Sequence, residues 1–178
     1  MANKVTMPIK SIEKIREFKV EVNKGQNGFR NLLLVEIGLA TALRISDLLK
    51  LKKSNIYDGF ISIKTEKTDK AMRLELNPRV HKLVTSYTEL LEDEDLLFPI
   101  GYRQSLKMLS AAAQRADISD FGTHTLRKTC AWQYYNSFGK DLRKTMVLLG
   151  HESPTDTIKY LNLDIDEVNK DLVLMDLD

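Results

Sequence analysis

A chain of 178 residues is long enough for one domain with a sizeable core, but it leaves no room for a second large module. Its apolar stretches are short and interrupted by charge, which excludes a membrane span of ~20 apolar residues, and its start lacks the apolar run of a secretory signal. We therefore expect a soluble, cytoplasmic protein, and a lone cysteine, Cys130, fits a reducing compartment.

The net charge of +2 conceals an uneven distribution of charge. Residues 164–178 hold six acids and one lysine, and the remaining chain holds 26 basic and 19 acidic residues. Eight bases and four acids lie between Arg44 and Arg73. Such a surface fits either a nucleic-acid partner or an ordinary solvated helix and hairpin, so charge alone leaves both interpretations open.

The first predicted elements are helical. Residues 1–28 are expected to form an N-terminal extension, and apolar residues at helical spacing predict a helix from Phe29 to Leu43. Ser46-Asp47 then predicts the cap of a short helix through Leu51. This arrangement places Arg44 at a joint between two helices.

A β-hairpin is predicted next. Asp58-Gly59 is a turn signal, and Phe60–Lys64 and Ala71–Leu76 both alternate between apolar and polar residues. Lys67 lies in the polar turn region between these two strands.

The remainder of the chain is predicted to be helical. Apolar spacing and capping residues indicate helices over about 78–91, 102–116, 125–138 and 141–149. Ser153-Pro154 begins a last short helix, which carries Tyr160. The predicted fold class is therefore α+β and mostly α, a helical domain with a small antiparallel sheet.

The most specific motif is His124-x-x-Arg127, followed by Leu148-Leu149-Gly150-His151 and then by Tyr160. Displacement at a DNA phosphodiester needs neutralised equatorial oxygens, an in-line nucleophile and a proton for the leaving oxygen. Arginine suits the first need, because its planar fork donates two hydrogen bonds to a phosphate and stays charged. Arg44 and Arg127 are therefore candidates for a phosphate clamp.

The other groups can supply the remaining chemistry. His124 and His151 can donate hydrogen bonds or move protons near neutrality, and Tyr160 provides a hydroxyl nucleophile. Because a free phenol has a pKa near ~10, cationic neighbours are needed to favour its phenolate. Lys67, on the hairpin turn, could protonate the departing 5′ oxygen. The histidines and Cys130 lack a His-x-x-x-His or Cys-x-x-Cys pair, so neither a metal site nor another cofactor is expected.

The ordered set of motifs resembles the catalytic domain of the tyrosine recombinase, or phage integrase, family over residues 29–163. The similar segments are Ala40-Thr41-Ala42-Leu43-Arg44-Ile45-Ser46-Asp47-Leu48-Leu49, Lys67-Thr68-Asp69-Lys70, His124-Thr125-Leu126-Arg127, and Leu148-Leu149-Gly150-His151 with Tyr160. Asp47 stands where the family often has glutamate, which keeps the carboxylate beside Arg44.

The resemblance implies a site-specific recombinase of bacterial or phage origin, associated with the nucleoid, that needs no metal or nucleotide. Strand cleavage would form a 3′-phosphotyrosyl link to Tyr160, with Lys67 as general acid, although Lys64 or Lys70 could take that role. The acidic segment 164–178 would be exchanged between protomers, as such segments are in the family. The implied partners are double-stranded DNA, further copies of the chain as a dimer or tetramer, and an accessory DNA-binding protein. Candidate DNA contacts are Lys52, Lys53, Lys64, Lys70, Arg73 and Lys128.

Two alternatives share most of these features. A recombinase-derived DNA-binding regulator or accessory factor would keep the fold and the basic face without exchanging strands. A topoisomerase that uses tyrosine would share the cleavage chemistry and would relax plasmids that lack a special site.

Overall fold

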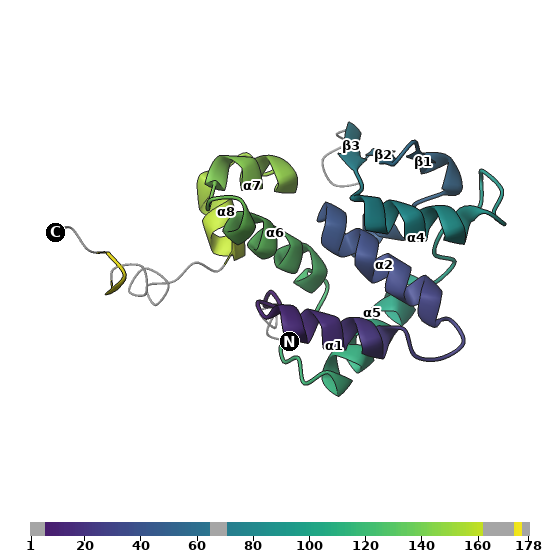
Figure 1. Cartoon of the computed structure of the whole chain (residues 1–178), viewed down its shortest axis with the longest axis horizontal. Helices are drawn as coiled ribbons and strands as arrows, with labels where there is room; N and C mark the ends of the chain where they lie inside the picture. Colours follow the sequence, from purple (N-terminus) through teal and green to yellow (C-terminus); the bar gives the residue numbers. More distant parts are fainter. Residues whose placement is uncertain (1–5, 65–70, 162–172, 176–178) are drawn as a thin grey trace.

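The computed structural model describes residues 6–64, 71–161 and 173–175, and it combines helices with a small sheet (Figure 1). The elements in chain order are α1 (Ile12–Val22), α2 (Gly28–Thr41), α3 (Ile45–Leu48), the 3-10 helix η1 (Lys53–Asn55), β1 (Ile56–Tyr57), β2 (Phe60–Lys64), β3 (Ala71–Glu75), α4 (Pro78–Thr88), α5 (Tyr102–Arg115), α6 (Thr125–Ser137), α7 (Leu142–Leu149) and α8 (Pro154–Leu161). The predicted class, α+β and mostly helical, is confirmed. Within these described ranges, no helix has the length and apolar character that crossing a membrane requires.

The sheet contains the predicted hairpin and one additional strand. Its order is β1-β2-β3 and both pairings are antiparallel, with Phe60 opposite Glu75 and Lys64 opposite Ala71. Strand β1 was not predicted, because two residues are too few to show an alternating pattern. Residues 65–70, which include Lys67 and Lys70, fall outside the described residues.

Helix α2 forms the centre of the core. Leu33, Leu34, Val35 and Ile37 are all buried, and α2 packs against α1, α4 and α6. At Gly38 a Cβ would lie 3.2 Å from the side chains of both Leu48 and Leu126, so glycine allows α3 and α6 to approach α2 closely. This contact fixes the N-terminal half of α6, which begins next to His124.

Helix α1 lies within the segment expected to be an N-terminal extension. Ser11 caps it by accepting a hydrogen bond from the Lys14 amide, and its apolar stripe is Ile15, Phe18 and Val22. These three side chains are buried in the same core cluster as α2. Part of the predicted extension therefore contributes to the core of the domain.

The predicted start of α3 was wrong. The helix begins at Ile45 with Arg44 as its N-cap, and the pair Ser46-Asp47 lies inside it rather than capping it. Ile45 and Leu48 are both buried, so the apolar spacing determines where the helix forms. The Asp47 carboxylate is also buried, and its Oδ2 lies 3.9 Å from Arg44 Nη1.

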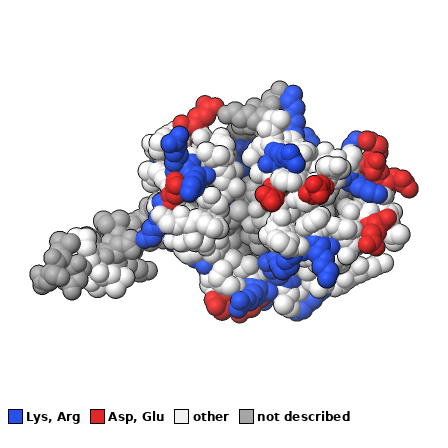
Figure 2. All heavy atoms as spheres, turned by 45° about the horizontal axis from the view of Figure 1, so that its top comes forward, with Lys and Arg blue, Asp and Glu red and all other residues white. Residues whose placement is uncertain are grey.

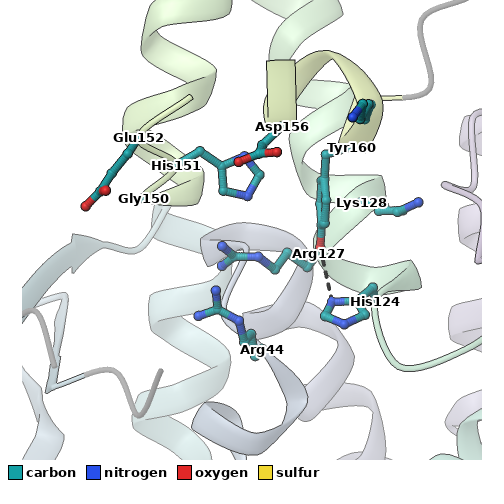
Figure 3. A pocket seen from close by; sticks show the side chains of 10 residues that line it. Arg44, His124, Arg127, Lys128, Gly150, His151, Glu152, Asp156 and Tyr160 are labelled. Atoms are coloured by element: carbon teal, nitrogen blue, oxygen red, sulfur yellow. Dashed lines mark hydrogen bonds between the residues drawn. The ribbon is translucent and has the colours of Figure 1, made fainter. Parts of the chain in front are cut away.

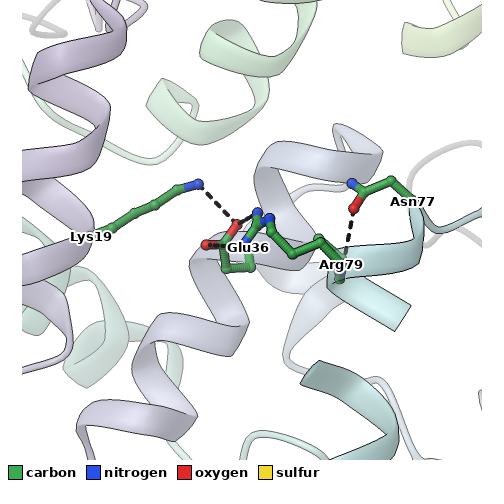
Figure 4. Close-up of polar contacts among 5 residues, drawn as sticks. Lys19, Glu36, Asn77 and Arg79 are labelled. Atoms are coloured by element: carbon green, nitrogen blue, oxygen red, sulfur yellow. Dashed lines mark hydrogen bonds and ion pairs between the residues drawn. The ribbon is translucent and has the colours of Figure 1, made fainter. Parts of the chain in front are cut away.

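A buried carboxylate, that of Glu36 on α2, joins α2 to α1 and α4. Glu36 accepts two hydrogen bonds from Arg79 of α4, at 2.9 and 2.5 Å, and one from Lys19 of α1, at 2.9 Å (Figure 4). Burial alone would raise the pKa of Glu36, but the hydrogen bonds from Arg79 and Lys19 outweigh it and hold the pKa below its ordinary value. Ionised Glu36 therefore stabilises the packing of α1 and α4 on α2.

We expect Glu36→Gln to lower the free energy of unfolding by about 1–3 kcal/mol, because it removes a buried charge partner of two cations. The folded-state pKa is depressed, so this contribution is present above the unfolded pKa of about 4.3 and is lost as the pH falls through the folded value. Urea unfolding of both proteins at pH 7 and pH 3 checks this, since the difference between them should shrink at pH 3. The matched control is Glu17→Gln, which removes an exposed pair with Lys14 and should change stability by less than about 0.5 kcal/mol. If Glu36→Gln lowered the free energy of unfolding equally at pH 7 and pH 3, the prediction would be contradicted.

Candidate active site

A cavity of about 630 Å³ lies where the start of α3, the start of α6 and the α7–α8 turn meet. Its lining residues are Arg44, His124, Arg127, Lys128, Gly150, His151, Glu152, Asp156, Lys159 and Tyr160. Five of the six side chains predicted from sequence to be catalytic are in this set, and they come from four separate parts of the chain. The sixth, Lys67, lies outside the described residues.

Arg127 is fixed by the ends of two helices. Its Nη1 donates to the Ala42 carbonyl at 2.6 Å and its Nη2 to the Leu149 carbonyl at 2.5 Å. These buried carbonyls can accept from the guanidinium because α2 and α7 both end at a left-handed residue, Ala42 at φ 55° and Gly150 at φ 60°. The negative ends of two helix dipoles therefore face the guanidinium and stabilise its charge.

Arg44 lies beside Arg127, and Figure 3 shows both guanidinium groups in the cavity. Its Nη1 is 3.9 Å from the buried Asp47 carboxylate. Burial lowers the pKa of Arg127, and the neighbouring charge of Arg44 lowers it further. Two cations held together in a cavity favour an anion between them, because an anion offsets both their desolvation and their mutual repulsion.

Tyr160 enters the cavity from α8 with its hydroxyl pointing toward the start of α6 (Figure 3). Its Oη lies 3.3 Å from His124 Nδ1, and either partner can donate this hydrogen bond, depending on the imidazole tautomer. The Tyr160 ring also packs in T-shaped contact with two imidazole rings. The distance between ring centroids is 6.2 Å to His124 and 5.2 Å to His151. The phenol thus adjoins both histidines.

Two opposing effects set the pKa of the phenol. Burial raises the pKa of Tyr160, while the charges of Arg127 and Arg44 act to lower it, and the net direction is upward. The hydroxyl therefore stays protonated at neutral pH. A reaction at this oxygen needs a proton acceptor, and His124 Nδ1 is within hydrogen-bonding distance.

His151 has a partner that sequence reasoning missed. Its Nδ1 lies 3.0 Å from the hydroxyl of Thr157, which is fully buried. This contact helps to fix the orientation of the imidazole ring, which lines the cavity. The signal was present in the sequence, because Thr157 precedes Tyr160 by three residues and so shares its face of α8.

The six candidate DNA contacts are in different settings. Lys52 forms a 2.5 Å ion pair with Glu94, and Lys53 donates to the Leu91 carbonyl, so both engage the segment after α4. Arg73 stacks on Phe60 with its guanidinium carbon 3.9 Å from the ring centroid. Lys64 is exposed at the end of β2, Lys70 is outside the described residues, and Lys128 lines the cavity.

The surface around the site carries mixed charge. The space-filling view shows Lys and Arg side chains on both sides of the hollow between the part with α6–α8 and the part with the sheet, interspersed with acidic groups (Figure 2). The basic character of this face therefore comes from a dispersed set of cations rather than from one continuous patch.

Comparison with known proteins bears on the family and the fold of this chain. The model of the phage integrase family matches residues 8–167. The probable integrase/recombinase YoeC of Bacillus subtilis (strain 168) is 32% identical over 171 residues, which cover 91% of this chain and 92% of that protein. Tyrosine recombinase XerD of Staphylococcus aureus is 28% identical over 81% of this chain, which spans only 54% of the length of XerD. The solved catalytic domain of bacteriophage HP1 integrase has the same fold, with a TM-score of 0.71, 23% identity and 88% of each chain covered.

Proposed function

This chain belongs to the phage integrase family, and from that premise we propose that it cleaves and rejoins DNA strands at a specific site through a covalent 3′-phosphotyrosyl link to Tyr160. The observation that carries the proposal is the convergence of both arginines, both histidines and the tyrosine on one cavity. The two non-bridging oxygens of a DNA phosphodiester suit this set of donors.

The first step is capture of the scissile phosphate. Arg44 and Arg127 would neutralise its non-bridging oxygens, and the imidazole of His151, which lines the same cavity, would donate a further hydrogen bond. Because the carbonyls of Ala42 and Leu149 already hold Arg127, its guanidinium loses little freedom on binding. Such preorganisation is the main way in which an enzyme stabilises charge that develops during a reaction.

The second step is the displacement at phosphorus. The Tyr160 oxygen forms a bond to phosphorus, the bond from phosphorus to the 5′ oxygen breaks, and the phenol proton passes to His124. The departing 5′ oxygen takes a proton from a general acid, for which we propose Lys67. The alternatives are Lys64, the last residue of β2, and Lys70, which precedes β3 in the sequence. Attack of a 5′ hydroxyl on the phosphotyrosine reverses these steps, so the link conserves the energy of the broken bond.

A nicked duplex provides the test of this proposal. Cleavage next to a nick releases a short fragment, which prevents rejoining and traps the covalent protein–DNA adduct. The substrate comes from DNA that flanks the encoding gene and carries inverted repeats. We expect the strand labelled at its 5′ end to become linked to the protein through its newly formed 3′ phosphate, whereas covalent linkage of the fragment labelled at its 3′ end would overturn the mechanism.

The partners that we propose are double-stranded DNA, further copies of this chain and an accessory DNA-binding protein. The C-terminal segment supports the second of these. Val173, Leu174 and Met175 are 85%, 81% and 58% exposed, although all three are apolar. Apolar side chains grouped in the open favour a partner surface. We propose that segment 164–178 packs on a neighbouring copy when several copies assemble on DNA.

Replacing Val173 and Leu174 together with aspartate should reduce assembly on DNA with two sites at least about tenfold, because charged groups would enter an apolar contact. Binding to DNA with a single site should stay within about twofold. Native gel shifts with the two substrates measure both effects. The matched control is Val20→Asp, which places the same charge at an exposed apolar position on α1, outside the C-terminal segment. Unchanged assembly in the double variant would contradict a role for the segment in oligomerisation.

A further inference from the structure

Lys128 occupies a position that the steps above do not use. It follows Arg127 on α6, and its Nζ lies over the ring of Tyr160, 5.3 Å from the ring centroid. That distance is within the range of about 6 Å in which a cation is attracted to an aromatic face. The lysine and the two histidines therefore contact the same ring from different directions.

Lys128 is held by a segment close to the N-terminus. Its Nζ donates a 2.8 Å hydrogen bond to the Thr6 carbonyl. Residues 6–10, here named the N-terminal strap, run along α6 and the loop before it. The hydrogen bonds of the strap are Met7 N to the Asp120 carbonyl, Ile9 N to Thr129 Oγ1, and Gln133 Nε2 to the Lys10 carbonyl.

The strap is also packed closely against the loop that leads to His124. A Cβ built on Gly122 would lie 2.4 Å from Thr6 Cγ2, so the two residues are in direct contact. Ile9 is buried in the main core cluster. The strap is thus anchored at several points, and the Thr6 carbonyl is a fixed acceptor for the lysine.

We propose that Lys128, held by the N-terminal strap, is a positioning residue for the nucleophile Tyr160. Its ammonium group keeps the Tyr160 ring directed at the phosphate site and favours the phenolate during attack. The inference rests on the proposed role of Tyr160. A cation at the ring face restricts the ring to one orientation, and it stabilises negative charge that develops on the phenol. The charges of Arg127 and Arg44 act to lower the pKa of the same phenol from its oxygen end, whereas Lys128 lies over its ring.

The first test measures the phenol directly and needs no DNA. The full chain is labelled with ¹³C-tyrosine, the Tyr160 resonance is assigned with Tyr160→Phe, and its pKa is measured by NMR titration. We expect Lys128→Met to raise the pKa of Tyr160 by about 0.5 unit or more, and Lys128→Arg to stay near the wild-type value. Lys107→Met, which removes an exposed lysine of α5, is the control for a general loss of charge. If the methionine variant is unstable, Lys128→Gln serves the same purpose.

The second test measures adduct formation on the nicked substrate. We expect Lys128→Met to slow the single-turnover rate about tenfold at saturating protein, to change DNA affinity less than threefold, and to be rescued by arginine. A variant that weakens DNA binding but leaves both the pKa and the saturated rate unchanged would make Lys128 a phosphate contact only, which overturns the inference. If the wild-type protein forms no adduct on any substrate, the proposed function fails, while the titration still decides whether Lys128 acts on Tyr160.

Discussion

Tyr160→Phe should abolish the covalent adduct on nicked DNA, with a loss of at least about 10⁴-fold, because it removes the oxygen that forms the bond to phosphorus in the mechanism that we propose. DNA binding should remain within a few-fold of wild type. The substitution deletes the contact with His124 but keeps the ring, so the packing against His151 and Lys128 should persist. Stability should change by no more than about 1 kcal/mol.

The adduct is resolved on denaturing gels after incubation with end-labelled DNA. Tyr134→Phe is the matched control, because that tyrosine also lies on a helix but faces a different groove, beside Leu148. Persistence of the adduct in Tyr160→Phe would assign the nucleophile to another residue. A cellular effect that survives Tyr160→Phe and is lost in a variant unable to bind DNA would instead favour a DNA-binding regulator derived from a recombinase.

Local patterns predicted much of the fold because the interactions that form each element are near in sequence. The Asn77-Pro78 start of α4 is one case, since Asn77 accepts a hydrogen bond from the Val80 amide. The start of α3 is the opposite case. Ser46-Asp47 has the composition of a cap, but burial of Ile45 and Leu48 against the core moves the helix start to Ile45. Tertiary packing outweighs a capping preference worth only about 1 kcal/mol.

For the site, the sequence predicted which residues meet but not what holds them. The order and spacing of the motifs singled out Arg127, yet its partners Ala42 and Leu149 contribute only backbone carbonyls, which no side-chain pattern reveals. The N-terminal strap was missed for a similar reason. Thr6 reaches Lys128 across 122 positions, and a contact at that separation depends on the whole fold.

Arg127→Ala should lose both activity and stability, because the guanidinium has two functions. It lines the cavity in which we propose that the phosphate binds, and it connects the C-terminal ends of α2 and α7. Its removal leaves the Ala42 and Leu149 carbonyls without this donor in a buried setting, at a cost of about 1–3 kcal/mol each. We expect the adduct rate to fall about 10³-fold and the free energy of unfolding to fall by about 3 kcal/mol.

Arg127→Lys separates the two functions. An ammonium keeps the charge but lacks a planar fork, so it can satisfy one carbonyl or face the phosphate, but it cannot bridge both helix ends. We therefore expect partial recovery of stability and an adduct rate still at least about 100-fold below wild type. Urea unfolding and single-turnover cleavage measure the two quantities on the same preparations, with Arg103→Ala on α5 as an exposed arginine control. If lysine restored the full adduct rate, the cavity would require only a positive charge at this position. The two helix ends would then not be needed to orient the guanidinium for catalysis.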